Sequence, residues 1–400
     1  MSDAPSSPAA DRCLDDPTIT NGTGPPTLDD IRARLKTVED PILGDDVVSL
    51  GLVDDVRVDD DLIVVRMGLY APYAPSERRI VERVNEALCG SERTVITVAG
   101  NRDRTWEAGE RIAGVRNVVP FVSTHARTEP STVATNVAFA LSRAGARVGV
   151  LELDDYVPGT NRSSGRGDGA SGDRGGSDRA TRDRGRGHRD RDGTETPATM
   201  PATVRGVRLA SSRHLLASGA GRRSDAPSTD PDASIDRLLT DIDWSGSDYL
   251  FVDVTTERSD LRRALFDRVS TAGAVVTTTR SASIATVRAC FDRLEERGVT
   301  PFGLIESVNG SVRGALRRRF DLTPSRWVAD ESDVPVLGTL PEDPALTADH
   351  GTAVVGEDDR FAAVFDAVAA NVADAVGASE RRAHSRRNGR FEAGLGCQCR

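Results

Sequence analysis

Hydrophobic positions along this chain form two blocks, which polar stretches separate. In the first block, apolar residues recur at helical spacing, then alternate over two short runs, then return to helical spacing before a last strand. Three consecutive aspartates at positions 59–61 divide the two alternating runs and suit a hairpin turn. The pattern predicts a small α/β domain over residues 27–100. Its expected elements are a helix that Thr27 caps, strands Val53–Val58 and Leu62–Leu69, a helix Ser76–Leu88 and a strand Thr94–Val98.

The second block alternates short, continuous apolar strands with amphipathic helices. Strands of that kind are typical of a parallel sheet whose two faces are both covered by helices. The fold class expected is therefore α/β, with a small N-terminal α/β domain followed by a mostly parallel sheet with helices on both faces. The expected strands are Val118–Ser123, Val148–Leu153, Val204–Leu209, Tyr249–Asp253, Ala274–Thr278, Phe302–Ser307 and Val336–Pro341. The expected helices are Ser131–Ala144, Ile235–Ile242, Asp260–Val269, Ile284–Arg297 and Arg360–Val376.

Four polar segments lie around these blocks. Residues 1–26 and an insertion at 160–202, rich in Gly, Arg, Asp and Ser, contain too few apolar residues to offset the entropy of ordering, so both are expected to be disordered. Residues 101–116 are expected to form a linker, and residues 117–376 the large domain. Residues 377–400 are expected to be a mobile basic tail.

Composition limits the classes of function. The formal net charge of −10 argues against a chain that binds polyanions along its whole surface. Without an apolar run of about 20 residues or a signal peptide, a cytoplasmic protein is expected. Five cysteines are too few and too scattered for a disulfide framework. One lysine among 52 basic residues fits a high-GC genome, and a salt-adapted archaeal source is expected.

The most informative stretch is 117–158, which reads as strand, loop, helix and strand, as in proteins that bind phosphate through a P-loop. Such a loop needs glycines, whose backbone N–H groups approach phosphates closely, and a lysine that reaches the β- and γ-phosphates. Residues 123–132 read STHARTEPST and contain neither. The scaffold of a nucleotide switch is present, and its chemistry is missing.

Several motifs resemble those of the Mrp/ApbC proteins, which are deviant P-loop ATPases that carry iron–sulfur clusters within the ParA/MinD group. The first domain is similar to the PaaD/SufT-like module that is often fused to them. The motifs of the large domain are NVA at 136–138, GARVGVL at 145–151, Tyr156 with Pro158, DYLFVD at 248–253, VVTT at 275–278 and PVLG at 335–338. Those of the small domain are VEDP at 38–41 and VVSLGLV at 47–53.

The resemblance also shows where the nucleotide chemistry departs from the family. The family's two lysines are replaced by His125 and Pro130. Three of its glycines are replaced by Ala126, Arg127 and Glu129. The family's hydroxyl residues are retained as Ser131 and Thr132. Pro130 removes an N–H donor from the helix N-terminus. A Glu129 carboxylate about 4 Å from a phosphate charge would cost about 4 kcal/mol at an effective dielectric constant near 20.

The acidic motifs are retained in part. Glu152 replaces one aspartate, whereas Asp154 and Asp253 remain. Asp253 is either a magnesium ligand or a strand-end residue that caps the next turn, and the second interpretation is favoured. The resemblance thus implies a vestigial nucleotide site, with Arg127 as the residue around which a binding loop could have been rebuilt. Its members are Arg127, Ser131, Thr132, Asp154 and Asp253.

Cluster-binding cysteines are missing at the family's positions. No cysteine lies between Cys290 and Cys397, and Ala74 stands where the small module has its reactive cysteine. Cys397 and Cys399 are the remaining candidates for a metal or iron–sulfur cluster, since thiolates bind both. An incidental pair at a chain terminus is the favoured alternative.

These observations favour a pseudo-ATPase without catalytic residues. It would be a nucleotide-independent accessory factor that works with iron–sulfur assembly proteins or a true Mrp ATPase, in a homo- or heterodimer. The alternative is an active ATP-binding and magnesium-binding cluster carrier that uses Cys397 and Cys399. A third hypothesis is a ParA-like nucleic-acid or partitioning factor that works through the arginine-rich tail, although neither a membrane nor a nucleic acid is the expected partner.

Overall fold

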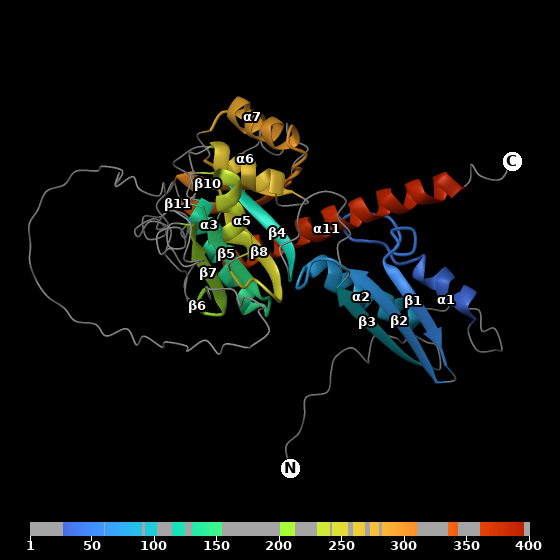
Figure 1. Ribbon diagram of the computed structural model, residues 1–400. Coiled ribbons are helices and arrows are strands. Elements are labelled where there is room, and N and C mark those ends of the chain that lie inside the picture. The colour runs from blue at the N-terminus through green and yellow to red at the C-terminus, as the bar shows by residue number, and fades with distance from the viewer. Residues whose placement is uncertain are drawn as a thin grey trace, which may run out of the picture.

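The computed structural model describes two α/β domains and a long C-terminal helix that reaches from one to the other (Figure 1). The helix, α11 (Ala362–Leu395), begins against the large domain and continues alongside the small one. The described residues are 27–59, 61–89, 93–101, 114–124, 130–153, 201–212, 230–240, 242–254, 259–268, 273–279, 282–309, 335–342 and 361–395.

The small domain has the elements that the sequence pattern predicts. Strand β2 lies in the middle of a three-stranded sheet, antiparallel to β1 and parallel to β3. Thr27 and Asp30 form a capping box at the first helix, in which each side chain accepts a hydrogen bond from the other's backbone N–H. The elements are α1 (Leu28–Leu35), β1 (Val53–Val58), β2 (Leu62–Leu69), α2 (Pro75–Leu88) and β3 (Thr94–Asn101).

One face of this sheet carries the core of the small domain. Ile63, Val65 and Met67 alternate along β2 and are fully buried, as the period of a half-buried strand requires. Ile80 and Val84 of α2 belong to the same apolar cluster. The domain therefore has its own hydrophobic core.

The large domain is built on an eight-stranded sheet in the order β11-β10-β9-β4-β8-β5-β7-β6. All neighbouring strands pair in parallel except β6 and β7, which form a short antiparallel edge. The α/β fold class expected from the sequence is confirmed. The strands are β4 (Val115–Ser123), β5 (Val148–Glu152), β6 (Ala202–Val204), β7 (Val207–Ser211), β8 (Ser247–Asp253), β9 (Ala274–Thr279), β10 (Pro301–Asn309) and β11 (Val336–Glu342).

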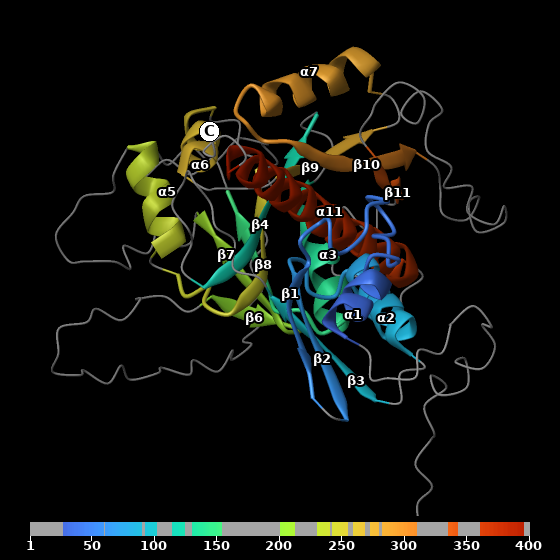
Figure 2. The same cartoon turned by 90° about the vertical axis from the view of Figure 1, so that its right-hand side faces the viewer.

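Helices cover both faces of this sheet (Figure 2). Along β8, Tyr249 and Phe251 pack into the core beneath α3 and α11, whereas Leu250 and Val252 pack into the core on the other face. A strand buried on both faces has to be apolar throughout, which explains its continuous hydrophobic sequence. The remaining helices are α3 (Pro130–Arg143), α5 (Pro231–Thr240), α6 (Ser259–Arg268) and α7 (Ile284–Glu295).

Helix α11 differs from the expectation for the C-terminus. The predicted helix ends at Val376 and a mobile tail follows, but α11 continues to Leu395, so the expectation of a mobile segment is wrong for residues 379–395. Arg381 is fully buried, which removes it from the exposed basic surface that the nucleic-acid hypothesis requires. Among the described residues, one stretch, Ala362–Arg387, is long and apolar enough to cross a membrane, and half of its most apolar window is buried within the protein.

The remaining boundary predictions fall at or beyond the described residues. Residues 1–26 lie outside them, as do most of the predicted linker 101–116 and most of the predicted insertion 160–202. Cys290 is buried in α7, and burial raises the pKa of its thiol. Cys89, at the end of α2, is disulfide-bonded, whereas the number and spacing of the cysteines led us to expect no disulfide framework.

Candidate nucleotide and magnesium site

The candidate site lies at the carboxyl ends of the central parallel strands. Strand β4 lies between β8 and β9, and the chain leaves it through α3 to reach β5 on the far side of β8. In open parallel sheets, ligands bind beyond the carboxyl ends of the strands, where neighbouring connections diverge. The N-terminus of α3 and the end of β8 meet at such a position.

Two of the five predicted site residues are in direct contact there. The Ser131 hydroxyl, in the first turn of α3, donates a short hydrogen bond to the Asp253 carboxylate at the end of β8. Asp253 is 1% exposed, and Ser131 is partly buried. The contact joins positions that are 122 residues apart in the chain. It favours a role for Asp253 beyond capping the turn that follows its strand.

A hydroxyl and a carboxylate at these positions fit magnesium. P-loop NTPases hold Mg²⁺ with the serine or threonine of the loop and an aspartate at a strand end. The ion takes its other ligands from phosphates and water, so two protein oxygens suffice. The described residues contain no group of three or more His, Cys, Asp and Glu that could hold a metal without such help. Ser131 and Asp253 would therefore be the protein's ligands to magnesium.

The phosphate side of the site is different. Residues 125–129, which include Arg127, lie outside the described residues, and so does Asp154. The described segments on either side, 117–124 and 130–142, contain no Lys or Arg. Helix α3 begins with the buried Pro130, which has no N–H to offer a phosphate. Thr132 is buried, and its carbonyl accepts a hydrogen bond from the side chain of Asn136, 2.9 Å away.

Hydrogen bonds between strand ends hold this edge of the sheet in place. The hydroxyls of Thr124 and Thr278 are 2.8 Å apart, and the Thr124 N–H donates to the Thr277 carbonyl at 3.0 Å. On the other side, the Leu153 N–H donates to the Asp253 carbonyl at 3.1 Å. These bonds join the end of β4 to the end of β9, and the end of β5 to the end of β8, on the two sides of the Ser131–Asp253 pair.

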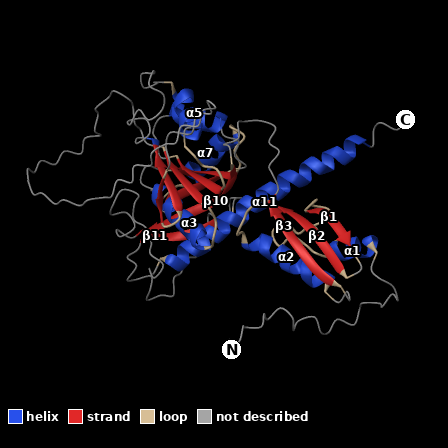
Figure 3. Ribbon diagram, turned by 60° about the horizontal axis from the view of Figure 1, so that its bottom comes forward, coloured by secondary structure: helices blue, strands red, loops and turns tan. Residues whose placement is uncertain are grey.

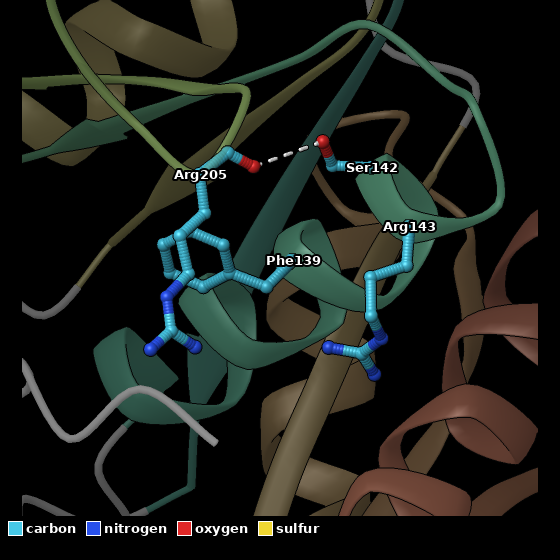
Figure 4. A pocket seen from close by; sticks show the side chains of 4 residues that line it. All are labelled: Phe139, Ser142, Arg143 and Arg205. Atoms are coloured by element: carbon cyan, nitrogen blue, oxygen red, sulfur yellow. Dashed lines mark hydrogen bonds between the residues drawn. The ribbon is translucent and has the colours of Figure 1, made fainter. Parts of the chain in front are cut away.

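A separate pocket lies at the other end of α3 (Figure 4). It has a volume of about 550 Å³, and its described lining consists of Phe139, Ser142, Arg143 and Arg205. Arg143 forms an ion pair with Asp366 of α11 at 2.5 Å. Since Ser142 is 11 residues beyond Ser131, a helical rise of about 1.5 Å per residue places the pocket roughly 16 Å from the Ser131–Asp253 pair.

Comparison with known proteins assigns the family. Residues 114–373 match the family model of the NUBPL iron-transfer P-loop NTPases, and residues 28–99 match the model of the iron-sulfur cluster assembly proteins. The chain belongs to the NUBPL iron-transfer P-loop NTPase family. The resemblance to the Mrp/ApbC proteins and to their small fused module is confirmed.

Relatives of this NUBPL-type chain span most of its length. The iron-sulfur cluster carrier protein of Deinococcus radiodurans is 28% identical, over 80% of this chain and 86% of the relative. That of Synechocystis is 26% identical, over 82% and 91%. Among solved structures, the septum site-determining protein MinD of Pyrococcus horikoshii, complexed with Mg-ADP, has a TM-score of 0.39 and 19% identity, over 66% of this chain and 98% of that chain.

The structure of this family member also shows residues that sequence reasoning missed. Asp40, Ser76, Glu77 and Arg381 meet where the two domains join. No local signal pointed to this contact, because residues 377–387 read GASERRAHSRR and contain no large apolar side chain that continues the helical spacing. Cys397 and Cys399 lie outside the described residues, so their role as metal ligands stays a prediction.

Proposed function

We propose that this NUBPL-family protein is a pseudo-ATPase, an accessory factor of iron–sulfur cluster assembly that does not depend on nucleotide. The observation that carries the proposal is the N-terminus of α3. It begins with Pro130, and the sequence before it lacks every glycine and lysine of a phosphate cradle.

The energetics of that helix end support the proposal. Phosphate binding at a helix N-terminus depends on free N–H donors and on the positive end of the helix dipole. Pro130 removes one of these donors, and Glu129 adds a carboxylate directly before it. Each change weakens attraction for an anion, and neither is offset by a basic side chain in the flanking segments 117–124 and 130–142.

The names of the relatives support the proposed cargo and partners. The relatives are named iron-sulfur cluster carriers and Fe-S cluster assembly factors. A member without a working nucleotide site would act in the cytoplasm as a scaffold for assembly proteins. It would pair with a second copy or with an Mrp-type ATPase that supplies the nucleotide chemistry.

Calorimetric titration with Mg-ATP tests the proposal directly. The full chain, shown to be folded and kept in high potassium chloride, is titrated beside Asp253→Asn, which keeps the shape of the side chain and removes its charge. The proposal predicts no binding heat for either protein and no release of phosphate. Micromolar binding by the unchanged chain that Asp253→Asn abolishes would overturn the proposal.

The second candidate function is an active ATP-binding cluster carrier. The observation that favours it is the contact between Ser131 and Asp253, because a site without selection for magnesium has no need of both groups in one place. This candidate requires Arg127 to replace the missing lysine and Cys397 with Cys399 to hold the cluster. Anaerobic reconstitution tests it. Cluster absorbance that disappears when both cysteines are changed to Ser would support the carrier function. Absorbance that is the same in the double variant as in the unchanged chain would rule that function out.

A further inference from the structure

Helix α11 is shared by the two domains (Figures 1 and 3). Its first part packs on α3 and on strands β10 and β11 of the large domain. Its later part packs on α2 of the small domain. One continuous helix therefore serves as a structural element of both domains.

Arg381 makes the central contact between α11 and the small domain. Its guanidinium donates to the Asp40 carboxylate at 2.5 Å, to the Glu77 carboxylate at 2.9 Å and to the Ser76 hydroxyl at 3.3 Å. The Arg381 and Asp40 side chains are fully buried, and the Glu77 side chain is 5% exposed. Two parts of the small domain, the segment at Asp40 and the first turn of α2, thus meet α11 at one charged group. We call these four residues the latch.

The absence of a side chain at position 377 leaves room for the contact between Arg381 and Glu77. A Cβ on Gly377, one turn before Arg381, would lie 2.7 Å from Nη1 of Arg381 and 2.9 Å from Oε1 of Glu77. One turn further back, the Asp374 carboxylate accepts a hydrogen bond of 2.7 Å from the Ser76 N–H. Glu77 also accepts hydrogen bonds from the backbone N–H groups of Tyr70 and Ala71. The same carboxylate therefore holds α11 and the loop that precedes α2.

That loop makes the other described contacts between the domains. The Asn117 side chain donates to the Tyr70 carbonyl at 3.1 Å, and the Tyr249 hydroxyl donates to the Pro72 carbonyl at 2.7 Å. Ala71 and Ala74 belong to the apolar cluster beneath α3 and α11. Apart from α11, the small domain meets the large one mainly through this short loop.

We propose that α11 and the latch form a releasable joint, which holds the small domain against the large domain in the structure seen here and lets it separate when the Arg381 contacts break. Buried ion pairs add little net stability, because the desolvation of both charges offsets their attraction, and full opening returns both to water. An interface held this way opens at lower cost than an apolar one of equal size. Removing one partner of a buried ion pair destabilises the closed interface, since it leaves the other charge buried and uncompensated.

Hydrogen–deuterium exchange of the full chain tests the joint, with Arg381→Met compared with the matched control Arg382→Met. Arg382 is the next residue of α11 and is exposed. In Arg381→Met we expect the rate of amide exchange to rise about tenfold or more over residues 70–77 and 377–387. Exchange in β1, β2, β4 and β8 should not change, because a local opening does not require unfolding of either core. Arg382→Met should exchange as the unchanged chain does.

A second variant keeps every charge and separates opening from misfolding. Gly377→Ala crowds Arg381 and Glu77, yet alanine favours a helix by about 1 kcal/mol over glycine. The releasable joint predicts slower exchange in the large-domain part of α11 and faster exchange over residues 70–77. The proposal would be overturned if exchange over residues 70–77 and 377–387 is unchanged in both variants. It would also be overturned if exchange over β1 and β2 rises as much as exchange over residues 70–77.

Discussion

The guanidinium of Arg381 lies 2.9 Å from the carboxylate of Glu77, although 304 residues separate them in the chain. Burial raises the pKa of Glu77 to about 7, against the opposing effects of Arg381 and of the Tyr70 and Ala71 N–H groups. A carboxyl group that titrates near neutrality therefore lies at the contact between the two domains.

The raised pKa of Glu77 predicts a pH dependence of stability. Below its ordinary pKa of 4.5, Glu77 is protonated in the folded and the unfolded chain. Between pH 4.5 and about 7, Glu77 keeps a proton in the folded chain that it has lost in the unfolded chain. The contribution of Glu77 to the free energy of unfolding therefore falls as the pH rises, by at most about 1.4 kcal/mol per pH unit. Above pH 7 both states are ionised and the loss is complete.

The comparison that isolates this contribution is Glu77→Gln against the unchanged chain. Denaturant unfolding from pH 5 to 8 should show that the variant gains stability relative to the unchanged chain as the pH rises, because glutamine does not ionise. A difference between the two proteins that stays constant across this range would contradict the prediction. Glu82→Gln, on the exposed side of α2, is the control and should leave the pH profile unaltered.

Asn117→Ala should destabilise the large domain. The Asn117 side chain is fully buried and donates to two carbonyls, those of Tyr70 at 3.1 Å and Asp248 at 3.0 Å. Alanine would leave buried acceptors without this donor, which typically costs about 1–3 kcal/mol. Denaturant unfolding measures the loss. The exposed Asn85, which accepts one hydrogen bond from Thr97, provides the control, and Asn85→Ala should change stability by less than about 0.5 kcal/mol.

Ser131→Ala should also reduce stability, and it bears on the nucleotide site. The buried Asp253 carboxylate would lose the hydroxyl that donates to it, at a cost of about 1–3 kcal/mol. Thermal unfolding should show this loss equally with and without Mg-ATP if the protein is a pseudo-ATPase. A rise in the melting temperature with Mg-ATP, seen in the unchanged chain and lost in Ser131→Ala, would contradict that expectation. Ser142→Ala, which removes an exposed 3.3 Å contact, is the control.

The elements of both domains could be predicted because hydrophobic period and turn chemistry are local properties of the sequence. Strands such as β8 are apolar throughout, and the hairpin between β1 and β2 has aspartates at its turn, so each was recognisable. The family resemblance placed Ser131 and Asp253 at one site, although the favoured interpretation of Asp253 was a residue that caps the turn after its strand.

The latch could not be predicted in the same way. Basic residues near a C-terminus usually remain in water, and nothing local to Arg381 distinguishes it from Arg382 or Arg386. Its burial depends on α11 continuing past Val376 and on Asp40 and Glu77, which lie in a different domain. A contact that joins such distant positions is determined by packing between domains, which a periodic pattern does not record.

The packing of Gly149 on Trp244 gives a prediction for the core of the large domain. A Cβ on Gly149, in β5, would lie 2.7 Å from one ring carbon of Trp244 and 2.8 Å from another. Trp244 is 1% exposed, so its indole has little room to move away. Gly149→Ala should therefore strain the core and lower the free energy of unfolding by about 1–3 kcal/mol.

Tryptophan fluorescence during denaturant unfolding, recorded in chains in which Trp106 and Trp327 are changed to Phe so that Trp244 alone emits, reports this change at the site itself. Gly100→Ala in β3 is the matched control, because a Cβ there would meet only the Met67 carbonyl, at an ordinary 3.6 Å, and neither glycine has a positive φ. Both variants add one methyl group to a strand and lower the entropy of the unfolded chain equally. The prediction is that Gly149→Ala unfolds at a lower denaturant concentration than Gly100→Ala. Equal midpoints would contradict the claim that the close approach of the Trp244 indole to β5 requires glycine at position 149.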